Sequence, residues 1–391
     1  QIPNSHKKSK VVVIGPCYPF RGGIATFVAH FCDSISQNYD TTLINYTTLY
    51  PSILFPGKTQ YDLSENKKIT FPNIRMLSSI NPLTWIRVAK KIISIQPDLI
   101  VIDWWQPFFG PCIRGVYTLL PKKLKSRVFI VAENVVSHES RWIDKFLTRL
   151  GFGVGKQYLA LSDEVVKQIN YFYTDKPIYK SNLPIYDTFS TASFDQYIEL
   201  KEKLGFSPTD KIILFFGYVR KYKGLDILIE AFAILKKKRK DVKLLIVGEF
   251  YDDPKQYTDI IDANQLNQVV KIIDFYVPNE DIEQYFRISN VVALSYRNGT
   301  QSGILNIALG FKKPVVSTNV GGLHEFIIDN KTGVICHNVN PNDFSNALDH
   351  FFDLEKNVNF EKNIDEVIQN NSFGKINNII SEAIAYSQTL N

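Results

Sequence analysis

The sequence predicts an α/β protein made of two doubly wound domains, each built on a parallel sheet. The chain has 391 residues, well past the size at which a single hydrophobic core usually stops growing, about 250 to 300 residues. Apolar residues make up 45% of the chain and charged residues 21%, a composition that supports two cores and excludes wholesale disorder. Short β-branched or aromatic runs alternate with helix-length amphipathic segments, as in βαβ units, and this alternation occurs twice.

Each half of the sequence contains five predicted strands. Those of the first half span residues 11–15, 41–46, 98–103, 128–132 and 157–162. Those of the second half span residues 211–217, 242–248, 269–275, 290–295 and 314–318. Near-continuous apolar runs such as VVVIG and KIILFFG are typical of strands that are covered by helices on both faces.

A polar, turn-rich stretch at residues 181–193 precedes the helical run 194–204 and predicts the domain boundary. We therefore expect an N-terminal domain of residues 1–190 and a C-terminal domain of residues 191–371. The last segment, 372–391, predicts an amphipathic helix that packs back on the N-terminal domain. Its apolar face contains Ile376, Ile379, Ile380 and Ile384.

The cysteine spacing, the charge and the lack of long apolar runs argue against several classes of protein. The four cysteines are scattered without C-x-x-C spacing, so the sequence predicts no disulfide framework, no metal site and a cytoplasmic location. Residues 1–10 lack a secretory signal, and no run approaches the roughly 18 apolar residues of a membrane span. Residues 1–190 hold 23 Lys and Arg against 13 Asp and Glu, whereas the remainder has an acidic excess. Two interpretations of this charge imbalance stay open: the two halves bind different partners, or the imbalance is accidental.

The first motif follows the first predicted strand. Gly22 and Gly23 precede a helix with Phe27 and Phe31 on its apolar face. Glycines let a ligand approach the backbone closely, and free N–H groups at a helix start favour an anion or a hydroxyl-rich ring. The pattern is not G-x-G-x-x-G, so it does not indicate a dinucleotide site. A plain strand-to-helix turn remains the alternative.

The second motif is the loop between Gly217 and Gly224. Its cationic residues, Arg220, Lys221 and Lys223, are suited to holding a diphosphate, because Arg binds such groups bidentately. Ordinary surface lysines at a turn are the alternative. The G-x-x-x-x-G-K-[ST] order is absent, which argues against a nucleoside triphosphatase.

The third motif spans residues 295–326. After a predicted strand, four residues open a helix and direct several N–H groups toward the sheet edge. These residues are Thr300, Gln301, Ser302 and Gly303. Two loops that are suited to binding an anion, both in one predicted domain, indicate a phosphorylated ligand.

Taken together, these motifs resemble the retaining glycosyltransferases of family 4, which have the GT-B architecture of two Rossmann-like domains. The matching features are the glycine loop at 217–224, Gly248-Glu249, Asp274-Phe275 followed by Val277, and the run KPVVSTNVGGLHEFI. The Gly22-Gly23 turn and the run DWWQPF at 103–108 are similar to a bacterial branch of this family.

The resemblance implies transfer of a sugar from a nucleotide-sugar to a glycan or lipid-linked acceptor in cell-surface polysaccharide biosynthesis, with no metal or cofactor. Lys223 matches the lysine that holds the donor diphosphate. In the family an arginine accompanies this lysine, directly after the first glycine of the loop, and this chain has Tyr218 at that place. Arg220, two residues later, is a candidate to take over the role of that arginine. The backbone at Ser302 and Gly303 matches the phosphate-binding helix start. Tyr276 and Val277 match the nucleobase pocket, and Gly248-Glu249 belong to the donor site.

Two departures from the family pattern concern catalysis. The family's E-x7-E pair is missing, because no acidic residue lies between Tyr296 and His324. Gln301 and Asn306 occupy that neighbourhood, where their amides can bind sugar and ribose hydroxyls. The family's histidine after the strand at 128–132 is replaced by Glu133, with His138 shortly after, and both are candidate catalytic residues.

Three functional hypotheses remain from the sequence. They are a glycosyltransferase, a nucleotide-sugar 2-epimerase of the same fold, and a degenerate transferase that serves as a binding subunit. The basic residues Lys122, Lys123, Lys125 and Arg127, next to the apolar run 116–120, also suggest contact with an anionic membrane at its inner face. A solvated helix end is the alternative. A nucleic-acid partner is not expected, because the cationic residues are dispersed.

Overall fold

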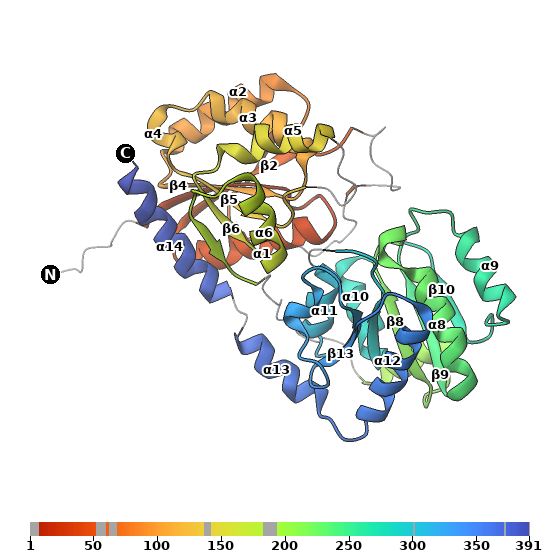
Figure 1. Ribbon diagram of the computed structural model, residues 1–391. Coiled ribbons are helices and arrows are strands. Elements are labelled where there is room, and N and C mark those ends of the chain that lie inside the picture. Colours follow the sequence, from red (N-terminus) through yellow and green to blue (C-terminus); the bar gives the residue numbers. More distant parts are fainter. Residues whose placement is uncertain are drawn as a thin grey trace. The chain divides into compact units, whose positions relative to one another are not determined.

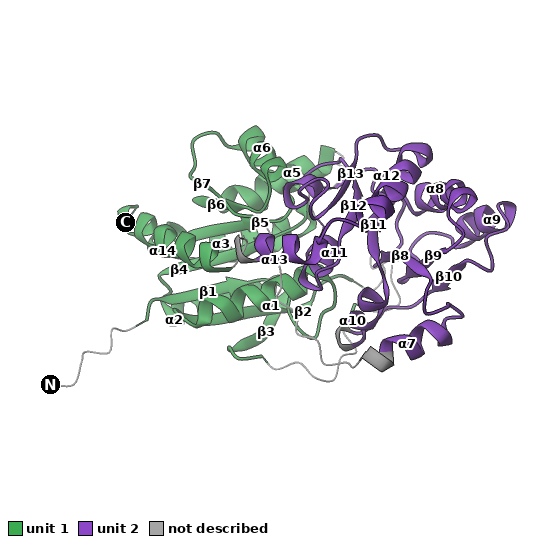
Figure 2. Cartoon of the chain, turned by 90° about the horizontal axis from the view of Figure 1, so that it is seen from below, with its two compact units in different colours: residues 1–182, 372–391 green, residues 183–371 purple. Residues whose placement is uncertain are grey.

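The computed structural model describes residues 8–51, 60–61, 69–136, 142–182, 194–299, 302–370 and 373–390 (Figure 1). The chain divides into two compact units, unit 1 with residues 1–182 and 372–391 and unit 2 with residues 183–371 (Figure 2). Both units are α/β structures, and every strand pair in their sheets is parallel. The predicted fold class is thereby confirmed.

Among the described residues, unit 1 contains a seven-stranded sheet in the order β3-β2-β1-β4-β5-β6-β7. The direction of the strand order reverses between β1 and β4, which is the point where open α/β sheets bind ligands. The strands are β1 (Lys10–Ile14), β2 (Asp40–Thr48), β3 (Asn73–Ser78), β4 (Leu99–Trp104), β5 (Val128–Ala132), β6 (Gln157–Ala160) and β7 (Ile178–Lys180).

Helices cover both faces of this sheet. Figure 1 shows α2, α3 and α5 on one face, while α1 and α14 lie together on the other. The described helices of unit 1 are α1 (Gly23–Ser36), α2 (Pro82–Ile95), α3 (Gly110–Thr118), α4 (Lys122–Lys125), α5 (Trp142–Gly151), α6 (Asp163–Phe172) and α14 (Phe373–Thr389).

The C-terminal helix α14 is joined to unit 1 by hydrogen bonds as well as by apolar packing. The buried amide of Gln157 on β6 donates to the Ala383 carbonyl and to Ser387 Oγ, both at 3.0 Å. On α1, Ser34 accepts from Asn377 at 3.1 Å. Ile376 and Ile380 are fully buried, so the apolar face that the sequence predicts is the face that packs.

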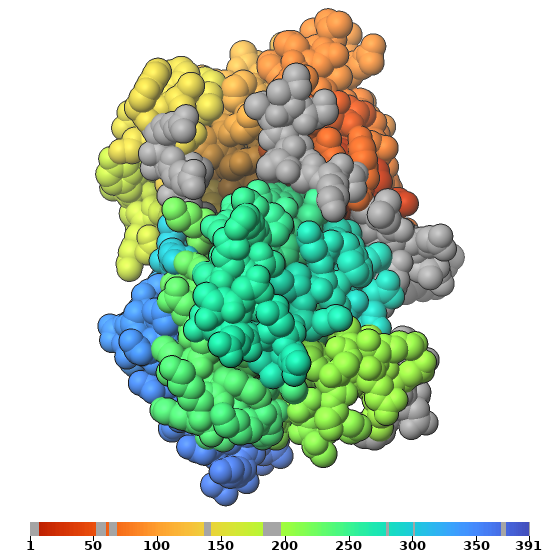
Figure 3. All heavy atoms as spheres, turned by 90° about the vertical axis from the view of Figure 1, so that its right-hand side faces the viewer, coloured from red at the N-terminus to blue at the C-terminus, as the bar shows by residue number. Residues whose placement is uncertain are grey.

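Unit 2 contains a six-stranded sheet in the order β10-β9-β8-β11-β12-β13 among the residues described. Helices α8 and α12 pack against each other, and both contribute fully buried residues, among them Leu228, Phe232, Phe344 and Leu348. The space-filling view shows the segment that contains α9, in teal, at the surface of this unit (Figure 3). The strands are β8 (Lys211–Phe216), β9 (Val242–Val247), β10 (Val270–Ile273), β11 (Val291–Leu294), β12 (Val315–Thr318) and β13 (Gly333–Cys336). The helices are α7 (Phe194–Lys203), α8 (Leu225–Lys238), α9 (Lys255–Ala263), α10 (Asn279–Ile288), α11 (Gly303–Gly310), α12 (Pro341–Leu354) and α13 (Phe360–Asn370).

The structure contains all ten predicted strands and adds β3, β7 and β13. All three are edge strands of their sheets, and β3 and β7 lack the two-sided burial that produces an apolar run. β7 has only three residues, and β3 contains the polar residues Asn73 and Arg75. The predicted boundary at 181–193 lies mostly outside the described residues, and the two units divide between residues 182 and 183.

The turn between β8 and α8 depends on Gly224. Gly224 and Gly205 both have left-handed φ values, 65° and 77°, so alanine is strained at either position. A Cβ at Gly224 would lie 2.0 Å from the Ser295 carbonyl oxygen, whereas a Cβ at Gly205 would meet nothing within 4 Å. We expect Gly205→Ala to cost about 1 kcal/mol and Gly224→Ala more than about 3 kcal/mol, because only the latter also displaces a strand end.

Thermal unfolding followed by circular dichroism measures this difference. Gly205→Ala is the control, because it has the same backbone strain without the steric clash. Equal losses in melting temperature for the two variants would show that the contact between Gly224 and Ser295 does not constrain the fold.

Candidate functional site

The candidate site lies at the carboxyl ends of the strands of unit 2. β8, β9, β10 and β11 end at this edge and are followed by the loops that contain most of the residues predicted for the donor site. Ligands of open parallel sheets bind at this edge, because the side chains and free N–H groups of several loops converge there.

Lys223 is the central cation of this edge. It ends the short 3-10 turn Lys221–Lys223, and only 6% of the residue is exposed. Its Nζ lies 5.9 Å from the centre of the Tyr296 ring, on the loop after β11. Among the described residues, no carboxylate pairs with this ammonium group. A buried cation without an acidic partner is costly, so the arrangement suits a site where an anionic ligand supplies the counter-charge.

The same burial changes the protonation of Lys223. Desolvation, together with the positive charge of Arg220, lowers the pKa of the Lys223 ammonium to about 7. A nearby anion has the opposite effect, because it stabilises the charged form and raises the pKa. The lysine is therefore suited to gaining a proton when a negatively charged group arrives.

Hydrogen bonds connect the loop after β11 to the loop that carries Lys223. Ser295 Oγ donates to the carbonyl oxygens of Lys223 at 3.1 Å and Gly224 at 2.8 Å. Arg297 forms a two-pronged ion pair with Asp226 on α8, with distances of 2.7 Å and 2.5 Å. These contacts position the lysine relative to the start of α11.

The start of α11 meets Lys223 near Gly217. A Cβ built on Gly217 would lie 3.0 Å from Ile304 Cδ1 and 3.1 Å from Lys223 Nζ, so the three residues converge. The Ser302 hydroxyl caps the helix by accepting from the Leu305 N–H at 3.3 Å, and it is 3.1 Å from the Tyr296 hydroxyl. The N–H groups of the first turn have no partner within the helix and are suited to an anion.

Asn306 carries a buried amide just beyond this helix start. The residue is 1% exposed, and within the described part of the chain neither its Nδ2 nor its Oδ1 has a hydrogen-bond partner. Buried amides are normally satisfied, so this one is a candidate for binding a ligand hydroxyl. Gln301, the other predicted amide, lies outside the described residues, as does Thr300.

Three tyrosines form an aromatic cluster next to Arg220. The Tyr218 ring centre is 4.8 Å from that of Tyr251 and 6.2 Å from that of Tyr276. The Arg220 guanidinium lies 4.6 Å from the centre of the Tyr251 ring. Aromatic faces of this kind stack on planar groups such as nucleobases.

Sequence reasoning singled out Tyr276 and missed the other two tyrosines of this cluster. The only local signal was the position of each: Tyr218 follows Gly217, and Tyr251 follows the Gly248-Glu249 pair by two residues. Val277 is buried, so its side chain belongs to the core of unit 2 and only its backbone is available to a ligand.

Gly248 and Glu249 join the loop after β9 to the loop after β8. A Cβ on Gly248 would lie 2.1 Å from the Gly217 carbonyl oxygen, so the two backbones touch. The Val219 N–H donates to the Glu249 carbonyl at 2.9 Å, and the Glu249 side chain is buried. Their visible role is to hold the loop after β8 in place.

In unit 1, the Gly22-Gly23 motif forms a helix start that is open to solvent. Gly22 precedes α1, which begins at Gly23, and a Cβ built on either glycine would meet nothing within 4 Å. Glu133 directly follows β5, where its N–H donates to the Trp104 carbonyl at 3.0 Å. His138, the other candidate predicted here, lies outside the described residues.

Asp103 is a titratable residue that the sequence analysis did not assign to the site. It lies on β4, next to the strand that precedes Glu133, and it is 3% exposed. Burial and the charge of Glu133 raise the pKa of Asp103 well above its usual range, and burial raises the pKa of Glu133 to about 8. Its position within the apolar run of β4 was the signal in the sequence that could have identified it.

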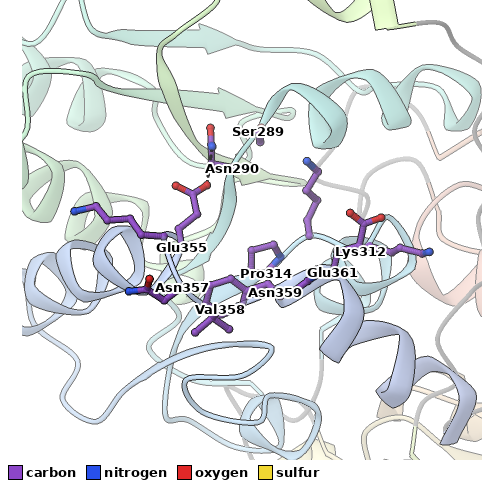
Figure 4. A pocket seen from close by; sticks show the side chains of 12 residues that line it. Ser289, Asn290, Lys312, Pro314, Glu355, Asn357, Val358, Asn359 and Glu361 are labelled. Atoms are coloured by element: carbon purple, nitrogen blue, oxygen red, sulfur yellow. Dashed lines mark hydrogen bonds between the residues drawn. The ribbon is translucent and has the colours of Figure 1, made fainter.

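A separate cavity of about 540 Å³ lies at the opposite edge of the unit 2 sheet, before β11 and β12 (Figure 4). Its polar side chains are already satisfied: Glu355 accepts from Lys211 at 2.6 Å and from Asn290 at 2.9 Å, and Lys313 donates to the Arg287 carbonyl at 3.2 Å. We therefore place the candidate site at the carboxyl edge and not in this cavity.

Neither a membrane span nor a metal site occurs in the part of the chain that the structure describes. No helix there has both the length and the apolar character that a membrane span requires. No group of three or more His, Cys, Asp or Glu side chains there is arranged to hold a metal ion.

Comparisons with known proteins point to one family. Residues 196–369 match the family described as glycosyl transferases group 1. A D-inositol 3-phosphate glycosyltransferase of Paenarthrobacter aurescens is 30% identical over 153 residues, which are 38% of this chain and 37% of that protein. The chain thus covers well under half the length of this relative. An uncharacterized glycosyltransferase of Methanocaldococcus jannaschii is 23% identical over 367 residues, or 88% of this chain and 89% of that protein.

Solved structures share the fold over nearly the whole chain. A glycosyltransferase from Rickettsia africae has a TM-score of 0.73 and 20% identity, and the alignment covers 97% of this chain and 99% of that one. Anabaena HepE in complex with UDP and glucose has a TM-score of 0.72 and 15% identity, with 96% and 99% covered. At such low identity the likeness shows the fold, and it confirms the predicted GT-B architecture.

The lowered pKa of Lys223 predicts how the stability of unit 2 depends on pH. The folded-state pKa of about 7 lies below the ordinary lysine value of 10.5, so between these pH values the unfolded chain binds more protons than the folded one. The free energy of unfolding should therefore rise with pH across this range, by up to about 1.4 kcal/mol per pH unit from this group.

Melting temperatures measured from pH 6 to pH 9 test this dependence. In Lys223→Met the contribution should vanish, so wild type should gain stability relative to the variant as the pH rises. Lys237→Met, at an exposed position on α8, is the control and should parallel the wild type. Parallel curves for Lys223→Met and wild type would rule out a neutral lysine in the free protein.

Proposed function

We propose that this protein, whose residues 196–369 match the group 1 glycosyltransferase family, transfers a sugar from a nucleotide-sugar to a glycan or lipid-linked acceptor. We further propose that the transfer retains the anomeric configuration, needs no metal and serves cell-surface polysaccharide biosynthesis. Anabaena HepE, which shares the fold, has been captured with UDP and glucose, and this favours a hexose on a nucleoside diphosphate as the donor.

The observation that carries the proposal is the convergence of Lys223, Gly217 and the start of α11. An ammonium group that is buried without an acidic partner among the described residues meets a set of helix-start N–H groups within one neighbourhood. Such an arrangement fits a diphosphate, whose charge compensates the lysine and whose oxygens accept the N–H groups. Gly217 leaves room for close approach, because a side chain there would occupy the space between Lys223 and Ile304.

The proposed mechanism follows from where charge develops. As the bond between the anomeric carbon and the donor phosphate oxygen breaks, negative charge grows on the departing diphosphate. Lys223, Arg220 and the first turn of α11 stabilise this charge, which lowers the barrier. The acceptor oxygen bonds to the anomeric carbon on the same face, and its proton passes to a donor phosphate oxygen. No strong protein base is then required.

Where the family has its glutamate pair, this chain has the amides Gln301 and Asn306, which are suited to binding hydroxyl groups. Asn306 has a buried amide whose nitrogen and oxygen are both unsatisfied among the described residues, so it is suited to a sugar or ribose hydroxyl that donates to one atom and accepts from the other. We propose the same role for Gln301. The tyrosine cluster at Tyr218, Tyr251 and Tyr276 is proposed to stack on the base.

Membrane contact is proposed for unit 1. Of the surface that the sequence suggested, Leu119, Lys122 and Lys123 are exposed, whereas Val116, Leu120 and Arg127 are buried, and Arg127 donates to the Pro97 carbonyl at 2.6 Å. The aromatic residues Trp142 and Phe146 on α5 are 80% and 60% exposed, and Lys145 on the same helix is exposed as well. Exposed aromatics together with basic residues are typical of binding to anionic lipid.

Loss of the central cation should lower catalysis. Lys223→Ala should reduce turnover by at least roughly tenfold, because one charged donor at a developing charge is removed. The assay is transfer or hydrolysis of the donor that most raises the melting temperature in a screen of UDP-, GDP-, ADP- and dTDP-sugars. Lys237→Ala is the control. Unchanged turnover in Lys223→Ala would remove this residue from the mechanism.

The same assay separates the alternatives that the sequence left open. A 2-epimerase would release an altered sugar without any acceptor, and a degenerate binding subunit would catalyse neither transfer nor hydrolysis.

Flotation with liposomes tests the membrane proposal. The protein should float with vesicles that contain acidic lipid and remain unbound with neutral vesicles, since the attraction is electrostatic. The double variant Trp142→Ala and Phe146→Ala should lose more than about half of the bound fraction, because apolar area is removed. Phe275→Ala, which removes an exposed aromatic from unit 2, should bind as the wild type does. Equal binding to acidic and neutral vesicles would reject the proposal.

A further inference from the structure

The cavity at the amino edge of the unit 2 sheet contains a lysine that uses only part of its hydrogen-bonding capacity. Lys313 lies between α11 and β12 and lines this cavity, whose volume of about 540 Å³ is in the range of sites for small molecules. Its Nζ donates to the Arg287 carbonyl at 3.2 Å, which uses one of its three N–H groups. Among the described residues no carboxylate forms an ion pair with Lys313. The cavity therefore offers spare donors to an anion.

The charged groups around Lys313 do not fully compensate its ammonium group. Arg287 on α10 and Lys201 on α7 oppose the protonated form, whereas Glu361 on α13 and Glu355, directly after α12, favour it. Burial has the largest effect and, together with the charge of Arg287, lowers the pKa of Lys313 to about 8. An anion in the cavity would counter this effect, because it favours the charged form of the lysine.

The first turn of α13 lines the same cavity. Asn359, Phe360 and Glu361 are among its lining residues, and Figure 4 shows the carboxylates of Glu361 and Glu355 well apart from each other. Asn359 Oδ1 accepts from the N–H of residue 362 at 3.0 Å and caps the helix. The N–H groups of Phe360 and Glu361 have no acceptor within the helix, because they belong to its first turn. The start of this 11-residue helix thus adds a partial positive charge to that of Lys313.

The rest of the lining is suited to hydroxyl groups. Asn357 and Asn359 contribute amides, and Glu355 and Glu361 contribute carboxylates. Carboxylates accept hydrogen bonds from hydroxyl groups, and amides both accept and donate. These groups extend the site beyond the few atoms of an inorganic anion, so the ligand has a polar body as well as a charge.

We propose that this cavity binds a small hydroxylated phosphate ester, such as a sugar phosphate. Its phosphate lies against Lys313 and the start of α13, and its hydroxyl groups lie against the amides and carboxylates. The cavity is at the opposite edge of the unit 2 sheet from the loop of Lys223, so this ligand is not the nucleotide-sugar of the proposed function. The inference therefore holds or fails independently of the transfer reaction.

Isothermal titration calorimetry of the full chain at pH 7 measures this binding with three probes. Glucose 6-phosphate should bind more tightly than inorganic phosphate, and glucose should not bind, because the charge supplies most of the attraction. Lys313→Met should weaken the binding of glucose 6-phosphate by at least about tenfold, since a charged donor is lost. Lys237→Met, which removes an exposed lysine from α8, is the control and should bind as the wild type does.

Two further variants distinguish this cavity from the donor site. Glu361→Gln should tighten binding by about twofold or more, because a like charge next to the phosphate is removed, and this exposed position also serves if Lys313→Met does not fold. Lys223→Ala should bind the probe as the wild type does. If Lys223→Ala loses binding while Lys313→Met keeps it, the phosphate binds at the carboxyl edge and the inference is wrong. Failure of both phosphate probes to bind would equally overturn it.

The pH dependence of binding identifies the lysine. The affinity for glucose 6-phosphate should fall as the pH rises from 7 to 9, because Lys313 loses its proton near pH 8. The decrease approaches about tenfold per pH unit above the pKa. The phosphate ester does not add to it, since its second pKa is about 6. In Lys313→Met the affinity should not change between pH 7 and 9, and a decrease equal to that of the wild type would contradict the proposal.

Discussion

The candidate site depends on one constraint, the burial of the Lys223 ammonium beneath the loops of unit 2 without a carboxylate among its described neighbours. Water no longer solvates this cation, and the surrounding hydrogen bonds hold its backbone in place. Ser295 bonds to the carbonyl oxygens of Lys223 and Gly224, and Gly224 lies so close to Ser295 that no larger residue fits. The folded protein thus already carries the free-energy cost of desolvating the ammonium group, and binding of an anionic ligand offsets this cost.

Desolvation acts on the two units in opposite senses. In unit 2 it makes a lysine release its proton more readily, and in unit 1 it makes the acids Asp103 and Glu133 retain theirs. In both places the neutral form is favoured, because burial penalises charge of either sign. Both groups lie near the carboxyl edges of their sheets, where parallel strands release their loops and where ligands of this fold class bind. The protonation of each group can therefore respond to a charged ligand.

The two units differ in their exposed aromatic side chains as well as in their charge. Unit 1 carries the exposed aromatics of α5 together with the basic excess of the first half of the sequence. Of the apolar residues next to the lysines of α4, Val116 and Leu120 are buried, and only Leu119 is largely exposed. A basic run next to an apolar run in sequence is therefore not enough to define a membrane surface, since one helix face must always fill the core.

The sequence alone determined the class of fold, because apolar runs covered on both faces and amphipathic helices produce periodicities that can be read locally. It also located the glycine loop at 217–224, the helix start at Ser302 and the apolar face of the final helix. Short edge strands such as β7 lacked that signal. Only the tertiary structure decided that Lys223 is buried beside Tyr296, that Tyr218 and Tyr251 join Tyr276, and that Asp103 lies beneath Glu133. These pairings join residues from different strands, and the burial that shifts their pKa values arises only when the sheet brings the strand ends together.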